Sequence, residues 1–340
     1  MSAIRVLVVD DSAFARKVVR ESLQTSDQIE VVGIARDGID ALEKIAELEP
    51  DVVTLDLVMP NLDGLGVLSA LSPEQRSRVV VVSMADGESD IGVAALGYGV
   101  FDLVHKPTAL AIASLHEIAE ELVSKVLLAA ARPRRASEPQ VEIVPSASLQ
   151  KHSDRVVLIG TSTGGPQALT RLLTALPADF PAPIAIVLHI PEGYTGPLAE
   201  RLNRDSAIEV LEAEEGLALR PGRAILAKAG VHLTLVGAAD ALTVHLEAGA
   251  SHSLHQPSVD VLFESAARCL GERALAVVLT GMGNDGLHGS RAIAEAGGQV
   301  LTESEVSCVV YGMPRAVREA GLSIAEAPIE QMALEIARRI

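Results

Sequence analysis

The sequence predicts a two-domain α/β protein: an N-terminal doubly wound domain with five parallel strands, and a C-terminal domain with a largely parallel sheet. Three observations support this fold class. A chain of 340 residues is longer than one domain usually needs. Short apolar runs typical of buried strands alternate with segments of helical periodicity in both halves. Between the halves, a stretch rich in Pro and Arg interrupts this alternation. We therefore expect domains over 1–128 and 155–340, joined by a flexible linker over 129–154.

Composition excludes several classes of protein. Apolar residues make up 49% of the chain, and no apolar run reaches the roughly 18 residues that a membrane helix needs. The first residues show no secretory signal, and two cysteines, Cys269 and Cys308, fit a reducing compartment. A net charge of −17 argues against binding to nucleic acid. We expect a cytoplasmic monomer that does not insert into membranes.

The first domain is predicted to alternate strands and helices along the chain. Its predicted strands cover 4–9, 30–35, 51–56, 79–83 and 101–104. Its clearest predicted helices cover 16–24, 40–47 and 115–128. Ligands of such doubly wound sheets bind at the carboxyl ends of the strands, which directs attention to the residues that follow each strand.

Polar residues cluster at these strand ends. Asp10 and Asp11 follow the first strand, and Asp56 ends the third. Crowded carboxylates repel one another unless a hard cation lies between them, and Mg²⁺ is the natural choice. Ser83 and Lys106 lie at the ends of strands four and five and can bind phosphate oxygens through a hydroxyl and an ammonium group. The pattern predicts a Mg²⁺ site beside a phosphoryl group carried by Asp56.

The second domain is predicted to repeat the alternation of strands and helices. Its predicted strands cover 156–159, 184–188, 224–227, 276–279 and 299–302. Its clearest predicted helices cover 198–203, 259–269 and 289–296. Ser258 and Asp260 are expected to begin and cap the helix over 259–269.

A Gly160-x-Ser162-x-Gly164 pattern lies between the first of these strands and a helix that is predicted to begin near Pro166. A tight turn in this setting lifts a serine side chain above the sheet edge and aims backbone N–H groups at one point. Taken alone, such a turn more often binds phosphate or only closes the connection.

Two further strands end in residues that complement Ser162. His189 follows the strand over 184–188, and Asp285 lies in the Gly-rich turn after the strand over 276–279. A neutral imidazole can take the proton of a serine hydroxyl, and a carboxylate can orient the imidazole and stabilise its cation. Backbone N–H groups of the Gly-rich turn can hold an oxyanion. The combination favours nucleophilic catalysis.

A different chain order of the catalytic residues is also conceivable. The α/β-hydrolase fold uses the order Ser, Asp, His, which here would combine Ser162 with Asp240 and with His252 or His255. Asp240 falls in a predicted hairpin turn, a routine surface position for Asp. We therefore prefer His189 and Asp285.

Residues 1 to about 125 resemble a response-regulator receiver domain. The resemblance implies that Asp56 accepts a phosphoryl group from a histidine kinase and that Asp10 and Asp11 hold Mg²⁺ beside it. It also implies that Ser83 and Lys106 contact the phosphate. The motifs that carry it are Val9-Asp10-Asp11-Ser12, Asp56-Leu-Val-Met-Pro60, Asp63-Gly64, Ser83 and Lys106-Pro107.

The second domain resembles the catalytic domain of the chemotaxis protein-glutamate methylesterases. The resemblance implies that Ser162 is the nucleophile, His189 the base and Asp285 its orienting partner, without a cofactor. Backbone N–H groups of Met282 and Thr163 are expected to bind the oxyanion. The motifs that carry it lie at 159–165, 188–195, 255–263, 279–286 and 307–314.

Together the resemblances imply a phosphorylation-activated methylesterase that demethylates the cytoplasmic domains of chemoreceptors and deamidates their glutamines by the same acyl chemistry. The unphosphorylated receiver is expected to inhibit the esterase, and phosphorylation of Asp56 to relieve this inhibition. The alternative is a non-catalytic module in which the receiver gates binding to a receptor. Replacing Ser162 with Ala separates the two hypotheses.

Overall fold

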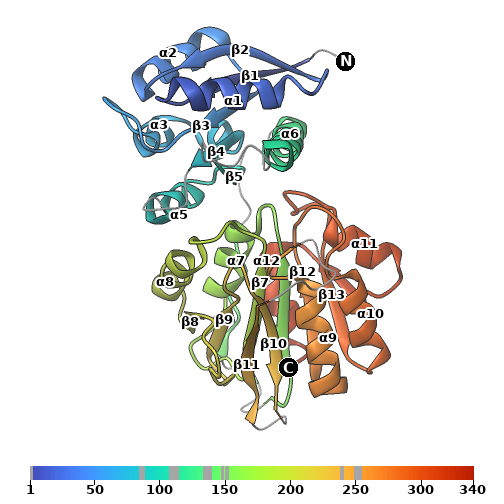
Figure 1. Ribbon diagram of the computed structural model, residues 1–340. Helices are drawn as coiled ribbons and strands as arrows, with labels where there is room; N and C mark the ends of the chain where they lie inside the picture. The colour runs from blue at the N-terminus through green and yellow to red at the C-terminus, as the bar shows by residue number, and fades with distance from the viewer. Residues whose placement is uncertain are drawn as a thin grey trace. The chain divides into compact units, whose positions relative to one another are not determined.

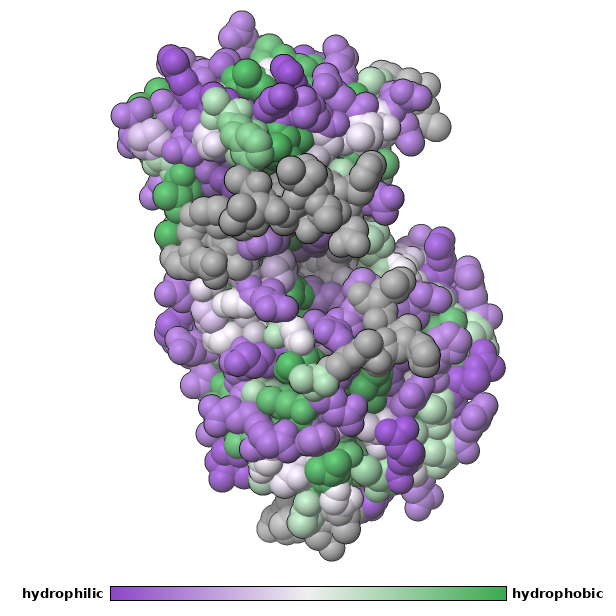
Figure 2. All heavy atoms as spheres, in the orientation of Figure 1, coloured by the Kyte–Doolittle hydropathy of each residue, from purple (hydrophilic) through white to green (hydrophobic). Residues whose placement is uncertain are grey.

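The computed structural model consists of two compact units, Met1–Glu138 and Pro139–Ile340 (Figure 1). The structure describes residues 3–83, 89–106, 115–132, 140–146, 149, 153–237, 241–248 and 255–340. Figure 2 shows hydrophilic residues over much of the viewed face of each unit, with hydrophobic residues in small patches. Within the described ranges, every helix is too short or too polar to cross a bilayer.

The first unit contains the predicted five-stranded parallel sheet. Its strand order is β2-β1-β3-β4-β5, the order of doubly wound sheets of the flavodoxin type. The strands are β1 (Ile4–Val9), β2 (Ile29–Ala35), β3 (Val52–Leu55), β4 (Val79–Ser83) and β5 (Asp102–His105). The helices are α1 (Ala13–Leu23), α2 (Gly38–Leu48), α3 (Gly64–Ala70), α4 (Pro73–Arg76), α5 (Ser89–Gly97) and α6 (Leu115–Ala131).

All three helices predicted for the first unit have limits that differ from the prediction, and α1 shows a local cause. This helix begins at Ala13 because the Ser12 hydroxyl accepts a hydrogen bond from the N–H of Ala15 at 3.3 Å. At the other end of the unit, α6 continues to Ala131, past residue 128. The short helices α3, α4 and α5 carry little periodicity, which is why the sequence did not place them individually.

The second unit contains a seven-stranded sheet in which all strand pairs are parallel, with the order β14-β13-β12-β6-β7-β9-β8. Its strands are β6 (Val156–Thr161), β7 (Ile184–Leu188), β8 (Glu209–Glu212), β9 (Arg223–Leu226), β12 (Ala274–Val278), β13 (Gln299–Glu303) and β14 (Ala325–Ala327). The antiparallel hairpin of β10 (His232–Val236) and β11 (Thr243–Glu247) is separate. The helices are α7 (Gly165–Thr174), α8 (Thr195–Asp205), α9 (Val259–Leu270), α10 (Leu287–Glu295), α11 (Met313–Glu319) and α12 (Ile329–Ala337).

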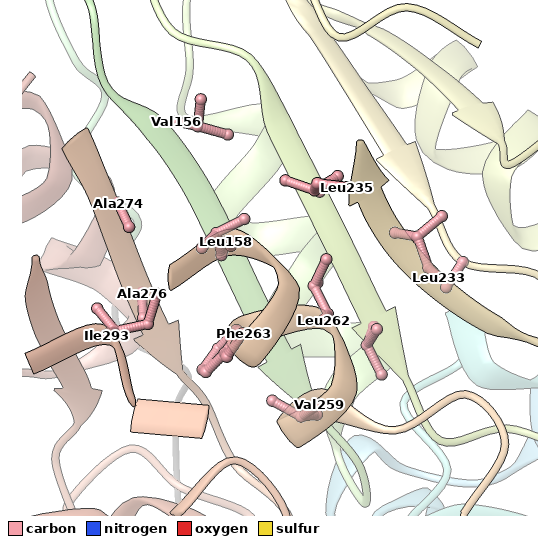
Figure 3. Close-up of a cluster of buried hydrophobic side chains, with 14 of the residues drawn as sticks. Val156, Leu158, Leu233, Leu235, Val259, Leu262, Phe263, Ala274, Ala276 and Ile293 are labelled. Carbon is pink, nitrogen blue, oxygen red and sulfur yellow. The ribbon is translucent and has the colours of Figure 1, made fainter. Parts of the chain in front are cut away.

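The core of the second unit lies around α9 (Figure 3). This helix packs against the central strands of the sheet and against the β10–β11 hairpin. Its Val259, Leu262, Phe263 and Ala266 are fully buried, and we expect truncation of the largest, Phe263, to cost about 3–5 kcal/mol. The labelled core residues are Val156, Leu158, Leu233, Leu235, Val259, Leu262, Phe263, Ala274, Ala276 and Ile293.

The predicted linker over 129–154 is described only in part. Its residues 142 and 144 pack with the second unit. The N–H of Glu142 donates to Glu330 O at 2.9 Å, and that of Val144 to Ala175 O at 3.0 Å. The side chain of Val144 is buried. The exact limits of domains and linker stay a prediction.

Candidate functional sites at two sheet edges

The predicted acidic cluster forms at the carboxyl edge of the first sheet. Carboxylate oxygens of Asp10, Asp11 and Asp56 lie within 4.8 Å of one another. Asp10 and Asp56 are each 2% exposed, whereas Asp11 is exposed. Lys106 Nζ lies 2.9 Å from Asp10 Oδ2 and 2.6 Å from Asp56 Oδ2. Three carboxylates beside the Lys106 ammonium group retain excess negative charge, and their oxygen ligands suit a hard divalent cation.

Asp56 has one engaged oxygen and one open oxygen. Its Oδ2 contacts Lys106, whereas its Oδ1 is buried without a hydrogen-bond partner among the residues that the structure describes. Burial raises the pKa of Asp56 to about 6, against the lowering effect of Lys106. Ser83 lies at the same edge, and its carbonyl oxygen accepts the N–H of Lys106 at 2.8 Å. The open oxygen can therefore attack a phosphorus atom or bind a metal.

In the second unit, strand register brings Ser162 and His189 side by side. Strand β6 lies between β7 and β12, and Thr161 on β6 is paired with Leu188 on β7. The next residues are Ser162 and His189, and the backbone N–H of His189 donates to Thr161 O at 3.1 Å. On the β12 side, the N–H of Ser162 donates to Thr280 O at 3.0 Å.

His189 is joined to Asp285, as the sequence predicts. Its Nε2 lies 2.8 Å from Asp285 Oδ2, and both side chains are about nine-tenths buried. Its Nδ1 is buried and has no hydrogen-bond partner in the described part of the chain. No hydrogen bond between the Ser162 hydroxyl and His189 is found there either. The base role of His189 therefore stays a prediction, with Nδ1 as the nitrogen left for it.

The N-terminus of α9 holds Asp285 in its charged form. Asp285 Oδ1 accepts from Ser258 Oγ at 3.0 Å and from the N–H of Asp260 at 2.9 Å. Its Oδ2 accepts from the N–H of Val259 at 2.7 Å. Burial alone would raise the pKa of Asp285, but His189 and these N–H groups outweigh it and hold the pKa below its ordinary value. A carboxylate that stays ionised can stabilise an imidazolium.

The turn that carries Ser162 is tightly enclosed. Gly164 has a φ of +80° and precedes α7, whose first N–H, from Gly165, donates to Ser162 O at 2.7 Å. A Cβ on Gly281 would lie only 2.9 Å from Ser162 Cβ, so the Gly-rich turn can approach because it lacks a side chain there. Thr163 is buried and Met282 is 38% exposed. Their oxyanion roles stay a prediction.

Two contacts of the site go beyond the sequence prediction. The ring of His255 stacks on His189, with centroids 4.2 Å apart and planes at 24°. Ser258 caps α9, as predicted, but the same hydroxyl also donates to Asp285. The motif that contains both residues was the available signal. Of the alternative residues, Asp240 and His252 lie outside the described ranges.

Two family models match the chain. The model described as "Response regulator receiver domain" matches residues 6–119, and that described as "CheB methylesterase" matches residues 157–336. The chain is 58% identical to protein-glutamate methylesterase/protein-glutamine glutaminase 5 of Myxococcus xanthus, covering 100% of this chain and 99% of the relative. It is 42% identical to the corresponding enzyme of Symbiobacterium thermophilum, covering 99% and 97%.

A solved structure resembles the second unit. The crystal structure of the Thermotoga maritima CheB methylesterase catalytic domain aligns with a TM-score of 0.53 and 36% identity. The alignment covers 55% of this chain and 98% of that domain.

Proposed function

The chain belongs to the CheB methylesterase family, and we propose that Ser162, His189 and Asp285 carry out its reaction. It is a receiver-regulated protein-glutamate methylesterase and protein-glutamine glutaminase of chemotaxis. One observation supports this assignment most directly. The Asp285 carboxylate contacts His189 Nε2, and His189 Nδ1 has no hydrogen-bond partner among the described residues. His189 and Ser162 follow paired residues of neighbouring strands, so this nitrogen is available for the serine.

In the proposed mechanism, Ser162 Oγ attacks the ester carbonyl carbon of a methylated glutamate while His189 Nδ1 takes the hydroxyl proton. Asp285 stabilises the imidazolium through Nε2. Backbone N–H groups of Thr163 and Met282 bind the oxyanion. Methanol leaves with the proton from His189, and a water activated by His189 then cleaves the acyl-enzyme. Deamidation follows the same course with ammonia as the leaving group.

The nitrogens of His189 are exchanged relative to the chymotrypsin arrangement, in which Nδ1 faces the carboxylate. Here Asp285 occupies Nε2, at 2.8 Å. The chemistry is preserved because either imidazole nitrogen can accept a proton when the other is a donor. The proposed neutral tautomer therefore carries its proton on Nε2.

The proposal for the first unit is phosphorylation of Asp56 through its open Oδ1, with a histidine kinase as phosphodonor. Asp10, Asp11 and Asp56 would hold Mg²⁺, because the cluster offers only hard oxygen ligands. When bound, the ion supplies positive charge that offsets the charge of the transferring phosphoryl group. Lys106 Nζ and the Ser83 hydroxyl would then bind phosphate oxygens, and this would raise esterase activity.

The proposed substrates are methylated cytoplasmic domains of chemoreceptors, and the proposed setting is the cytoplasm. The net charge of −17 disfavours nucleic acid as a partner, and a monomer is expected. A non-catalytic receptor-binding module is not favoured, because the relatives at 58% and 42% identity are named as enzymes.

Methanol release from methylated receptor fragments tests the catalytic assignment. Ser162→Ala should lower the rate by about 10³-fold or more while circular dichroism and receptor binding stay unchanged. The matched control is Ser206→Ala, since the Ser206 hydroxyl is buried without a partner among the described residues and lies at the end of α8. Ser162→Ala with wild-type methanol release would exclude Ser162 as the nucleophile.

A further inference from the structure

A buried carboxyl group near the esterase site, that of Glu303, has no part in the reaction described above. Glu303 is the last residue of β13, which pairs with β12, and it is 1% exposed. No ion pair in the described part of the chain includes it. Burying a carboxyl group without a paired cation costs several kcal/mol of folding free energy. A hydrophobic residue or a neutral amide at this position would destabilise the folded chain less.

Glu303 connects two loops at the carboxyl edge of the sheet. Its Oε2 accepts the backbone N–H of Thr280 at 2.8 Å, directly before the turn that carries Met282 and Asp285. Its Oε1 accepts the hydroxyl of Ser307 at 2.8 Å. Both contacts are buried. The low dielectric of the protein interior strengthens hydrogen bonds, so the loss of either one would cost more free energy than at the surface.

Thr280 in turn forms hydrogen bonds with Ser162 and with the residues on both sides of it. Its carbonyl oxygen accepts the N–H of Ser162 at 3.0 Å and the hydroxyl of Thr161 at 2.7 Å. Its own hydroxyl donates to Thr163 O at 2.9 Å and accepts the N–H of Val310 at 3.0 Å. A shift of Thr280 would therefore move Ser162 relative to the Gly-rich turn.

We propose that Glu303 is a positioning residue of the esterase, whose carboxyl group fixes Thr280 and thereby the geometry of Ser162 and the oxyanion turn. This inference rests on the proposed role of Ser162 as nucleophile. Glu303 contacts neither His189 nor Asp285, so it acts only through Thr280 and the segments that Thr280 joins.

The charge of Glu303 responds to pH near neutrality. Burial, with a smaller contribution from Glu330 on α12, raises its pKa to about 7. The hydrogen bonds from Thr280 and Ser307 and the charge of Arg171 on α7 oppose this rise. Glu330 and Arg171 are paired with each other at 3.1 Å. The thiol of Cys308 lies 3.9 Å from the Glu303 carbonyl oxygen. The carboxyl group is thus ionised mainly above neutral pH.

Glutamine is a mimic of the protonated form of Glu303. A protonated carboxyl can still accept from Thr280 and can donate its proton to the Ser307 hydroxyl, which can then donate to Ser304 O at 3.3 Å. An amide at this position can make the same contacts. Glu303→Gln should therefore match the wild type at acidic pH and differ from it where the wild type is ionised, because charge-assisted hydrogen bonds hold Thr280 more firmly.

The test uses the full-length chain with a small-molecule phosphodonor and two readouts. One is the rate at which a fluorophosphonate labels Ser162, and the other is methanol release from methylated receptor fragments. Glu303→Leu should lower the labelling rate and kcat by about tenfold or more, with KM little changed. The ratio of wild-type to Glu303→Gln rates should rise from near one at about pH 6 to severalfold at about pH 8.5.

The matched control is Glu212→Gln. Glu212 also ends a strand of this sheet, β8, and also accepts a side-chain hydroxyl, that of Thr195. It has no contact with Thr280, so its ratio to wild type should stay constant with pH.

Two results would overturn the proposal. One is a folded Glu303→Leu variant whose labelling rate is within about twofold of the wild type. The other is a wild-type to Glu303→Gln ratio that does not change with pH. If the Leu variant does not fold, this ratio alone tests the proposal. A wild type that is labelled at Ser162 but releases no methanol would contradict the proposed function instead, and the labelling ratios would still test Glu303.

Discussion

Asp56 and Asp285 occupy similar places in two parallel sheets but have opposite surroundings. Each follows a central strand and is buried. Asp56 has one oxygen on Lys106 and one without a partner within the described ranges, and its pKa is raised to about 6. Asp285 accepts hydrogen bonds on both oxygens, and its pKa is lowered. A carboxylate that is to react thus keeps an oxygen open, whereas one that is to stay charged is saturated with donors.

The largest expected effect comes from removing the open oxygen. Asp56→Asn should abolish phosphoryl uptake and the rise in hydrolysis that a phosphodonor produces, because an amide is not a competent nucleophile. Chelation of Mg²⁺ in the wild type should have the same effect. Incorporation of labelled phosphate measures both. Asp63→Asn is the control, since Asp63 caps α3 in the same unit and Asn caps equally well.

Neutralising the saturated carboxylate should have the next largest effect. Asp285→Asn should lower kcat for methanol release by about 10³-fold. The imidazolium of His189 loses its anionic partner, and the neutral ring loses the acceptor that fixes its tautomer. Asp260→Asn is the matched control, since Asp260 accepts the N–H of Gly289 at 2.7 Å and has no contact with His189. Equal losses in the two variants would contradict the distinct role of Asp285.

The pH dependence of stability should have opposite signs for Glu303 and Asp285. Glu303 binds more protons in the folded chain between its ordinary value of 4.5 and about 7, so stability falls as pH rises through this window. Asp285 has a lowered pKa, so its contribution is present above 3.8 and is lost as pH falls.

Urea unfolding at a series of pH values measures this difference. We expect Glu303→Gln to remove up to about 3 kcal/mol of the decline between acidic and neutral pH. An unchanged slope in this variant would show that Glu303 titrates near its ordinary pKa.

The smallest expected effect is the loss of one donor to Asp285. Ser258→Ala removes the hydrogen bond at 3.0 Å and the cap of α9, and should cost about 1 kcal/mol of stability and a few-fold in kcat. Differential scanning calorimetry and methanol release measure the two effects. Ser258→Thr keeps the hydroxyl and should recover both, whereas equal losses in the two variants would point to packing instead of hydrogen bonding.

Much of both sites could be predicted because parallel strands deliver the residues that follow them to one edge. Strands such as β1, β4 and β7 have the predicted limits, since each contains a run of apolar residues that is buried on both faces, such as residues 6–9 in β1. The motifs then place Asp56 after β3 and Asp285 after β12. This is sufficient for the identity of the residues at each site.

The surroundings of these residues could not be predicted, because they depend on which strands become neighbours. The order that places β6 between β7 and β12 is a property of tertiary packing. The stacking of His255 on His189 and the cap of α9 on Asp285 follow from that order. Glu303 belongs to no motif, and its burial and its contact with Thr280 appear only in three dimensions.

The hydrogen bonds between Asp285 and the N-terminus of α9 link activity to the folding of the whole second unit. The N–H groups of Val259 and Asp260 bind this carboxylate, while Leu262 and Phe263, one turn further, lie in the core. These two amide protons should therefore exchange with solvent as slowly as those of the central strands, through global opening alone. In a thermally stressed sample, residual specific activity would then report the fraction of molecules that are still folded.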